Sequence, residues 1–297
     1  MPSLFRGSAV ALATPFTQGK VDTAAIERLV DMQLEAGTAA IVACGTTGEP
    51  ATMNAEECEL VVRTVVHAVR GRVPVIAGTG SNCTQHVIDT ARRYEALGCA
   101  AQLVVTPYYN KTTAEGLYRH FMAVAEQTAL PIVIYNVPTR TALDIGPEVL
   151  ERLAGDERFV GLKESSYNLP YVMEKMRRIR GRMPIYSGND DMVAPLMAMG
   201  AQGVISVVAN VLPQKMVRMA TAALSGDPET ARDVQLELLP LICALFAEVS
   251  PIPCKAAMEM MGLCEGEVRL PLVPIGEANR ARLREALLEA GIPLVRE

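Results

Sequence analysis

One lysine is placed in the sequence where a buried amine could attack a carbonyl group. Lys163 follows the apolar run Phe159–Leu162, so we expect it at the end of a strand, pointing into the interior of the fold. Burying an ammonium group is costly, which favours the neutral amine that a Schiff-base nucleophile requires. A buried lysine paired with a carboxylate such as Glu164 is the alternative. Lys255 is a weaker candidate because it begins a helix outside the strands, and the other four lysines are expected to be solvated.

Three of the eight tyrosines follow two other apolar runs. Tyr108 and Tyr109 come after Gln102–Val105, and Tyr135 ends Ile132–Tyr135. A tyrosine can simply fill space, but its hydroxyl can also relay a proton while an imine and an enamine form. These positions therefore predict proton-transfer groups near the candidate lysine.

Two more segments could bind the acid groups of a substrate. The turn Gly45–Glu49 contains Thr46 and Thr47 between glycines, and its backbone N–H groups suit a small carboxylate, although an ordinary turn has the same composition. Arg140 follows a proline turn, where it could bind a carboxylate through two hydrogen bonds or be a surface arginine. Together with Lys163, these groups fit class I aldolase chemistry, in which a 2-oxo acid becomes an enamine that attacks an aldehyde.

Composition excludes several other classes of protein. The 297 residues have a net charge of −5, which argues against a nucleic-acid surface. Three scattered histidines and seven cysteines without a C-x-x-C spacing argue against a metal site, a catalytic triad or a disulfide framework. No apolar run reaches the roughly 18 residues of a membrane helix, and the N-terminus is a poor signal peptide, so a cytoplasmic location is expected.

The elements that must position these residues alternate along the chain. Short runs rich in valine and isoleucine predict strands covered on both faces, and amphipathic segments between them predict helices. The expected strands are 9–13, 40–43, 73–77, 102–105, 132–135, 159–162, 184–186 and 203–208. The expected helices are 24–36, 55–69, 84–97, 114–129, 147–153, 169–179 and 192–199.

Eight strand–helix units predict a (β/α)₈ TIM barrel with a C-terminal helical extension. A doubly wound open sheet is the alternative, but no G-x-G-x-x-G follows the first strand. We expect the barrel over residues 1–226 and a helical domain over 227–297. Within the latter, helices are predicted at 228–247, 251–261 and 276–290.

Five motifs together resemble the family of dihydrodipicolinate synthase and N-acetylneuraminate lyase, from Gly7 to about Pro274. They are Gly45–Glu49, Thr106–Asn110, Tyr135–Thr141, Gly161–Glu164 and Gly203–Ser206. The resemblance implies a homotetramer built as a dimer of dimers and no cofactor beyond a covalent Schiff base. It implies condensation of pyruvate with L-aspartate 4-semialdehyde, toward diaminopimelate and lysine.

The resemblance also implies roles for single residues. Lys163 is similar to the Schiff-base lysine and Tyr135 to the proton donor and acceptor. Thr46 and Tyr109 resemble the rest of the proton relay, with Tyr109 serving the neighbouring subunit. The positions that resemble substrate-binding residues are Thr47 and Ile205 for pyruvate, Arg140 for the carboxylate of the semialdehyde, and Gly188 at the mouth.

The chain departs from the lysine-inhibited members of this family at an interface pocket. Asn82 and Tyr108 match that pocket. Pro50, Ala55, Cys58 and His86 stand where the enterobacterial type has a serine, two histidines and a glutamate. Without the glutamate, the ammonium group of lysine lacks its obvious partner, so weak or absent feedback by lysine is expected.

Two other functions remain open at this point. The first is another aldolase of the same family, such as N-acetylneuraminate lyase or a 2-keto-3-deoxy-sugar-acid aldolase, although Arg140 favours an acidic second substrate. The second is a barrel without catalysis that binds a metabolite or supports an assembly. Such a protein would not need to keep Lys163, Tyr135, Thr46 and Tyr109 together.

Overall fold

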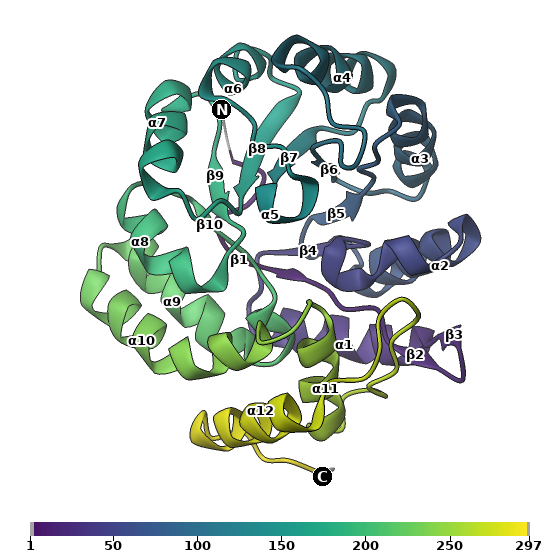
Figure 1. The fold of residues 1–297 in the computed structure, drawn as a ribbon, viewed down its shortest axis with the longest axis vertical. Coiled ribbons are helices and arrows are strands. Elements are labelled where there is room, and N and C mark those ends of the chain that lie inside the picture. Colours follow the sequence, from purple (N-terminus) through teal and green to yellow (C-terminus); the bar gives the residue numbers. More distant parts are fainter. Residues whose placement is uncertain (1–2, 296–297) are drawn as a thin grey trace.

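Eight parallel strands close into a barrel in the computed structural model, which describes residues 3–295 (Figure 1). β1 pairs with β4 on one side and with β10 on the other, so the barrel has no open edge. The strands are β1 (Gly7–Ala11), β4 (Ala40–Ala43), β5 (Val75–Gly78), β6 (Ala101–Val105), β7 (Ile132–Asn136), β8 (Phe159–Glu164), β9 (Ile185–Ser187) and β10 (Gly203–Ser206). The predicted TIM barrel is confirmed, with strand ends shifted by one or two residues.

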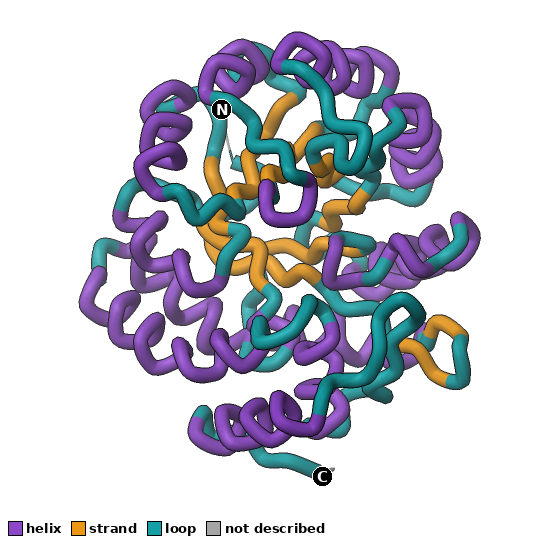
Figure 2. The backbone as a smooth tube through the Cα atoms, in the orientation of Figure 1, coloured by secondary structure: helices purple, strands orange, loops and turns teal. Residues whose placement is uncertain are grey.

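Helices surround the barrel on its outside, except for the short α5 (Pro138–Thr141), which lies over the barrel opening (Figure 2). They are α1 (Thr23–Glu35), α2 (Ala55–Val69), α3 (Thr84–Ala96), α4 (Ala114–Gln127), α5 (Pro138–Thr141), α6 (Pro147–Leu153), α7 (Leu169–Ile179), α8 (Val193–Ala198) and α9 (Pro213–Ser225). Of these, the one-turn α5 and the longer α9 are missing from the helices expected from sequence. The buried face of α9 consists largely of alanine and methionine. The antiparallel hairpin of β2 (Phe16–Thr17) and β3 (Lys20–Val21) is also additional.

The C-terminal helices are α10 (Pro228–Leu245), α11 (Ile252–Met260) and α12 (Glu277–Glu289), close to the predicted bounds. α10 packs against α8 and α9 as well as against α11 and α12. The division of the chain at residue 226 therefore stays a prediction. Within the described residues, none of the helices combines the length and the apolar character needed to cross a membrane.

A buried ion pair connects this C-terminal extension to the barrel. Lys255 in α11 is fully buried, and its Nζ lies 2.7 Å from Oε1 of Glu49 in the loop after β4. The placement of Lys255 on a helix beyond the strands is confirmed, but its side chain reaches back to the barrel. The extension is thereby held to the loop that contains Thr46 and Thr47.

The barrel interior is filled by alternate residues of the strands and is blocked at one end. The Tyr186 ring stacks on Phe5 with the ring centroids 4.1 Å apart, and its hydroxyl donates to the Phe5 carbonyl. Gly161 leaves room for Tyr186, since a Cβ there would lie 2.8 Å from the ring. Phe5 precedes β1, so this stack closes the barrel near the N-terminal ends of the strands and leaves the opposite end for chemistry.

A histidine on α4 is buried beside α3 with an incomplete set of hydrogen bonds. Nδ1 of His120 lies 2.9 Å from the Thr84 hydroxyl, while Nε2 is buried without a partner in the described part of the chain. Burial lowers the pKa of His120 to about 4, from a usual value of 6.5. The folded protein therefore holds this ring neutral in a pH range where the unfolded chain protonates it.

We predict that the free energy of unfolding falls by about 2 kcal/mol between pH 7.5 and pH 5 because of His120. The stabilisation is complete above pH 6.5 and is lost as the pH falls toward 4. Urea unfolding at both pH values measures it. The variant His120→Gln should lack most of this dependence and the exposed-site control His67→Gln should keep it; equal dependence in both would contradict the prediction.

Candidate active site

Lys163 and Tyr135 face each other across two neighbouring strands. They are paired in register between β8 and β7, and Nζ of Lys163 lies 4.3 Å from the centroid of the Tyr135 ring. Both side chains are buried. Lys163 is the last residue but one of β8, at the C-terminal mouth where barrel enzymes have their active sites.

Glu164 points to the opposite side of β8, as strand alternation requires. Its carboxylate accepts hydrogen bonds from Nζ of Lys175 at 3.0 Å and from Nδ2 of Asn136 at 2.7 Å. Lys175, which was expected to be solvated, is fully buried, and it also contacts Asp144. Burial raises the pKa of Glu164, and these partners oppose that shift.

The alternative of a Lys163–Glu164 pair is therefore wrong. In the part of the chain that the structure describes, Lys163 forms no ion pair with a carboxylate. The nearby Asp190 is buried, and it accepts hydrogen bonds from the Ser206 hydroxyl and from the Val207 backbone N–H at 2.9 Å. Burial raises the pKa of Asp190, while the charge of Lys163 acts in the opposite direction.

The backbone at Gly188 passes close to the stem of the lysine. A Cβ at this position would lie 3.0 Å from Cε of Lys163 and 2.0 Å from Oγ of Ser165. The Ser165 hydroxyl is itself buried without a hydrogen-bond partner among residues 3–295. Any side chain at position 188 would therefore displace the amine. The role of Gly188 at the mouth is steric.

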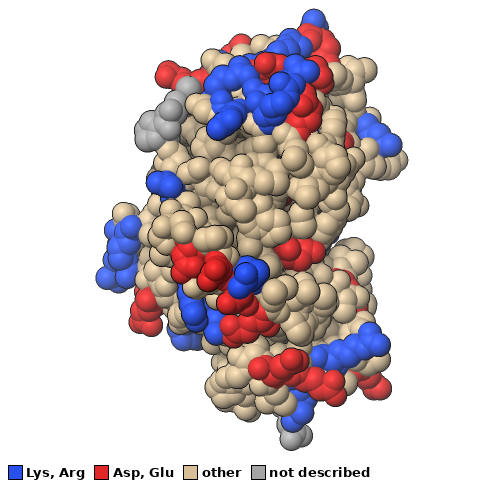
Figure 3. Space-filling model, turned by 90° about the vertical axis from the view of Figure 1, so that its left-hand side faces the viewer, with Lys and Arg blue, Asp and Glu red and all other residues tan. Residues whose placement is uncertain are grey.

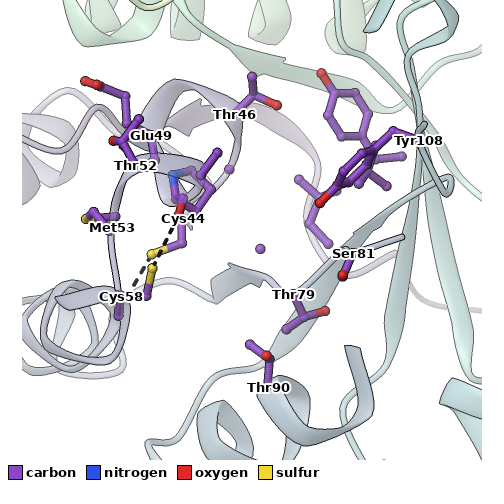
Figure 4. A pocket seen from close by; sticks show the side chains of 18 of the residues that line it. Cys44, Thr46, Glu49, Thr52, Met53, Cys58, Thr79, Ser81, Thr90 and Tyr108 are labelled. Carbon is purple, nitrogen blue, oxygen red and sulfur yellow. Dashed lines mark hydrogen bonds between the residues drawn. The ribbon is translucent and has the colours of Figure 1, made fainter. Parts of the chain in front are cut away.

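A cavity of about 710 Å³ opens beside Tyr135 (Figure 4). Thr46, Tyr108 and Arg140 line it with Tyr135, so residues from four separate loops and strands meet there. Lys163 itself is not in the cavity wall, whereas Tyr135, its neighbour across the strands, is. These four residues contribute three hydroxyl groups and one guanidinium group to the cavity wall, and Arg93 contributes a second guanidinium group.

The threonine turn is fixed from two sides. Thr46 begins a short 3₁₀ turn that ends at Gly48, whose carbonyl accepts a hydrogen bond from the Thr14 hydroxyl at 2.8 Å. Glu49 follows with a left-handed φ of +54° and holds Lys255. Thr46 reaches the cavity, while Thr47 is buried and does not line it.

The C-terminal extension forms part of the cavity wall. This contribution was not predicted from the sequence. Nη2 of Arg140 on α5 donates to the Ser250 carbonyl at 3.2 Å, and Val249 and Pro251 line the cavity beside it. These contacts join residues about 110 positions apart, and no local pattern indicates them.

The structure does not bring every predicted residue to this cavity. Tyr109 is 92% exposed with a left-handed φ of +66°, and it does not line the cavity with its neighbour Tyr108. Ile205 is buried inside the barrel on β10, opposite Ala9 of β1. Among residues 3–295, no three His, Cys, Asp or Glu side chains are arranged to hold a metal ion.

Comparisons with known proteins agree over nearly the whole chain. The model of the dihydrodipicolinate synthetase family matches residues 4–290. The 4-hydroxy-tetrahydrodipicolinate synthase of Caldicellulosiruptor bescii is 48% identical over 98% of this chain and 98% of its own. The solved structure of dihydrodipicolinate synthase from Thermotoga maritima has a TM-score of 0.96 at 44% identity, covering 98% and 100% of the two chains. The Acinetobacter baumannii enzyme complexed with pyruvate has a TM-score of 0.95 at 42% identity, covering 97% and 99%.

We predict that Lys175→Met lowers the free energy of unfolding by about 3–5 kcal/mol, because it leaves the buried Glu164 carboxylate without its cation. Urea unfolding measures the loss. The double variant Lys175→Met/Glu164→Gln should be more stable than the single variant, since no buried charge remains unpaired. A double variant that is no more stable than Lys175→Met would show that the ion pair is not the source of the loss.

Proposed function

Because the chain belongs to the dihydrodipicolinate synthetase family, we propose that it condenses pyruvate with L-aspartate 4-semialdehyde through a Schiff base on Lys163. The chain is an enzyme of the class I aldolase type, and the reaction is 4-hydroxy-tetrahydrodipicolinate synthesis in the lysine and diaminopimelate pathway. The observation that supports the proposed nucleophile most is a buried Lys163 without a carboxylate partner, beside Tyr135 at the barrel mouth.

The proposed reaction begins when Nζ of Lys163 attacks the keto carbon of pyruvate. Loss of water gives an iminium, and removal of a methyl proton gives an enamine whose carbon attacks the aldehyde. Tyr135, whose ring lies beside Lys163, is proposed to pass protons in both steps, and Thr46 is proposed as the next member of the relay. The electron sink is the covalent imine itself, so we propose no cofactor.

The substrate acid groups are assigned to two parts of the mouth. The Thr46–Gly48 turn and Ile205 are proposed to hold pyruvate, with Thr47 supplying the turn's second hydroxyl. Arg140 is proposed to bind the carboxylate of the semialdehyde, since its guanidinium lines the cavity. A sugar-acid aldolase is the second candidate. Its substrate carries hydroxyl groups, so we would expect residues that bind hydroxyl groups at the position of Arg140.

We also propose a homotetramer, arranged as a dimer of dimers, in the cytoplasm. Tyr109 is almost fully exposed in the single chain, so it can complete the relay only in a neighbouring subunit. On the face that carries α7, α8 and α10, Figure 3 shows a largely uncharged band, with one charged cluster above it and several charged clusters below it. Met173 and Met199 are exposed beside one hollow, which Arg6, Arg177, Arg180 and Arg182 also line, so a second contact between subunits proposed there would combine apolar and charged groups.

Borohydride reduction in the presence of pyruvate tests the mechanism. We expect a stable adduct that peptide mapping places on Lys163, and no adduct in Lys163→Ala. Lys20→Ala, at an exposed lysine, is the control and should be labelled like the parent protein. Labelling that persists in Lys163→Ala would reject the assigned nucleophile.

Arg140→Ala separates the two substrates. Trapping of pyruvate should be unchanged, while the KM for the semialdehyde should rise about 10-fold or more, because one charged hydrogen-bonding group is lost. A coupled assay with both substrates measures this. Release of pyruvate from sialic acid without condensation activity would instead favour the lyase.

Inhibition by lysine is predicted to be weak or absent. Pro50, Ala55 and His86 line the cavity at positions where lysine-inhibited members of the family have polar or charged residues. Without the glutamate of those members, the ammonium group of lysine lacks its obvious partner. Initial rates with added L-lysine measure this, and inhibition at micromolar lysine would contradict it.

A further inference from the structure

Two thiols lie side by side in the cavity wall, next to the threonine turn. Cys44 follows β4 directly before Gly45, and Cys58 is in the first turns of α2. The Cys44 sulfur is 3.6 Å from the Cys58 carbonyl oxygen, and the Cys58 sulfur is 3.9 Å from the Pro50 carbonyl oxygen. Figure 4 shows the two sulfurs adjacent to each other. Both residues are largely buried and line the cavity.

The surroundings make the two thiols unequal. The neighbouring Cys44 side chain lowers the pKa of Cys58, and Tyr94 and Arg93 act in the same direction. Burial and Glu57 oppose this shift. The pKa of Cys44 is raised by the same contact and by burial. Cys58 is therefore the thiol that ionises first, which is the usual property of a reactive cysteine.

The other five cysteines do not line the cavity. Cys99, Cys254 and Cys264 are buried, and burial raises the pKa of each thiol, to about 12 for Cys99 and about 11 for Cys264. Cys83 is half-buried and Cys243 is exposed, and both lie outside the cavity wall. Among residues 3–295, a pair of neighbouring thiols in the cavity wall is thus specific to positions 44 and 58.

We propose that Cys44 and Cys58 are a redox-sensitive pair, which forms a disulfide when hydrogen peroxide or a small organic hydroperoxide enters the cavity. The Cys58 thiolate attacks one peroxide oxygen, the O–O bond breaks, and the departing oxygen takes up a proton, leaving Cys58 as a sulfenic acid. The Cys44 sulfur then attacks the Cys58 sulfur, the S–O bond breaks, and the thiol proton leaves with the oxygen as water. Two thiols and one peroxide give one disulfide and two water molecules (or one water and one alcohol), so the sulfurs lose the two electrons that the peroxide gains.

The disulfide would act on the neighbouring turn. Cys44 has a left-handed φ of +53°, and its carbonyl is so close to Gly78 that a Cβ there would lie 2.0 Å from the oxygen. The backbone of Cys44 therefore has little freedom on the side of β5, so a bond to α2 shifts the segment that leads into Thr46. If Thr46 has the role in the relay proposed above, oxidation should lower the turnover number about 10-fold or more.

Peptide mapping of the full-length protein tests the pair without any assay of activity. No lysine or arginine lies between Leu29 and Arg63, so trypsin leaves both thiols in one peptide, 29–63, which contains no other cysteine. After peroxide treatment and alkylation, we expect this peptide unalkylated and lighter by two hydrogens than its reduced form. Dithiothreitol should restore two alkylation sites.

Cys58→Ser and Cys58→Ala should both abolish this species, and the exposed-site control Cys243→Ser should keep it. A peptide with sulfinic acid at Cys58 and no disulfide, a bond from Cys58 to Cys99, or oxidation of Cys243 while both cavity thiols stay reduced would each overturn the pair. Unchanged turnover of the disulfide form would overturn its connection to Thr46. Failure of the proposed function would leave the mapping result intact, so the two can be told apart.

Discussion

The ion pair between Glu164 and Lys175 is the interaction on which the site depends. β8 places two adjacent ionisable residues at the mouth, Lys163 and Glu164, and a direct pair between them would hold the amine as a salt. Strand alternation turns them to opposite faces, and Lys175 with Asn136 satisfies the carboxylate outside the barrel. The amine inside is left beside an aromatic ring and a hydroxyl.

Contacts between residues far apart in sequence also hold the rest of the mouth in place. The loop that contains Thr46 is held by Glu49 to Lys255, and α5 is held by Arg140 to Ser250. Both anchors belong to the C-terminal extension, far from their partners in sequence. The helices after residue 227 therefore contribute to the geometry of the cavity as well as to the packing around it.

Much of this arrangement could be predicted from the sequence. The barrel follows from the alternation of apolar runs with amphipathic segments, and the position of Lys163 follows from its place after such a run. Because adjacent residues of a strand point to opposite faces, strand alternation alone could also have excluded an ion pair between Lys163 and Glu164. The burial of Lys175 could not be predicted, because a lysine on an amphipathic helix is usually solvated and only tertiary structure brings Glu164 and Asp144 to it. The exposure of Tyr109 likewise could not be predicted, because the sequence places it beside Tyr108 in one loop and only the structure separates the two.

The stack of Tyr186 on Phe5 determines from which end of the barrel a molecule can reach the interior. Two stacked rings and a hydrogen bond fill the barrel near the N-terminal ends of its strands. Lys163 lies at the opposite, C-terminal end of the strands, so a molecule that reaches its Nζ has to approach through the mouth. The direction of approach is thereby set by two aromatic residues that are far from the lysine in sequence.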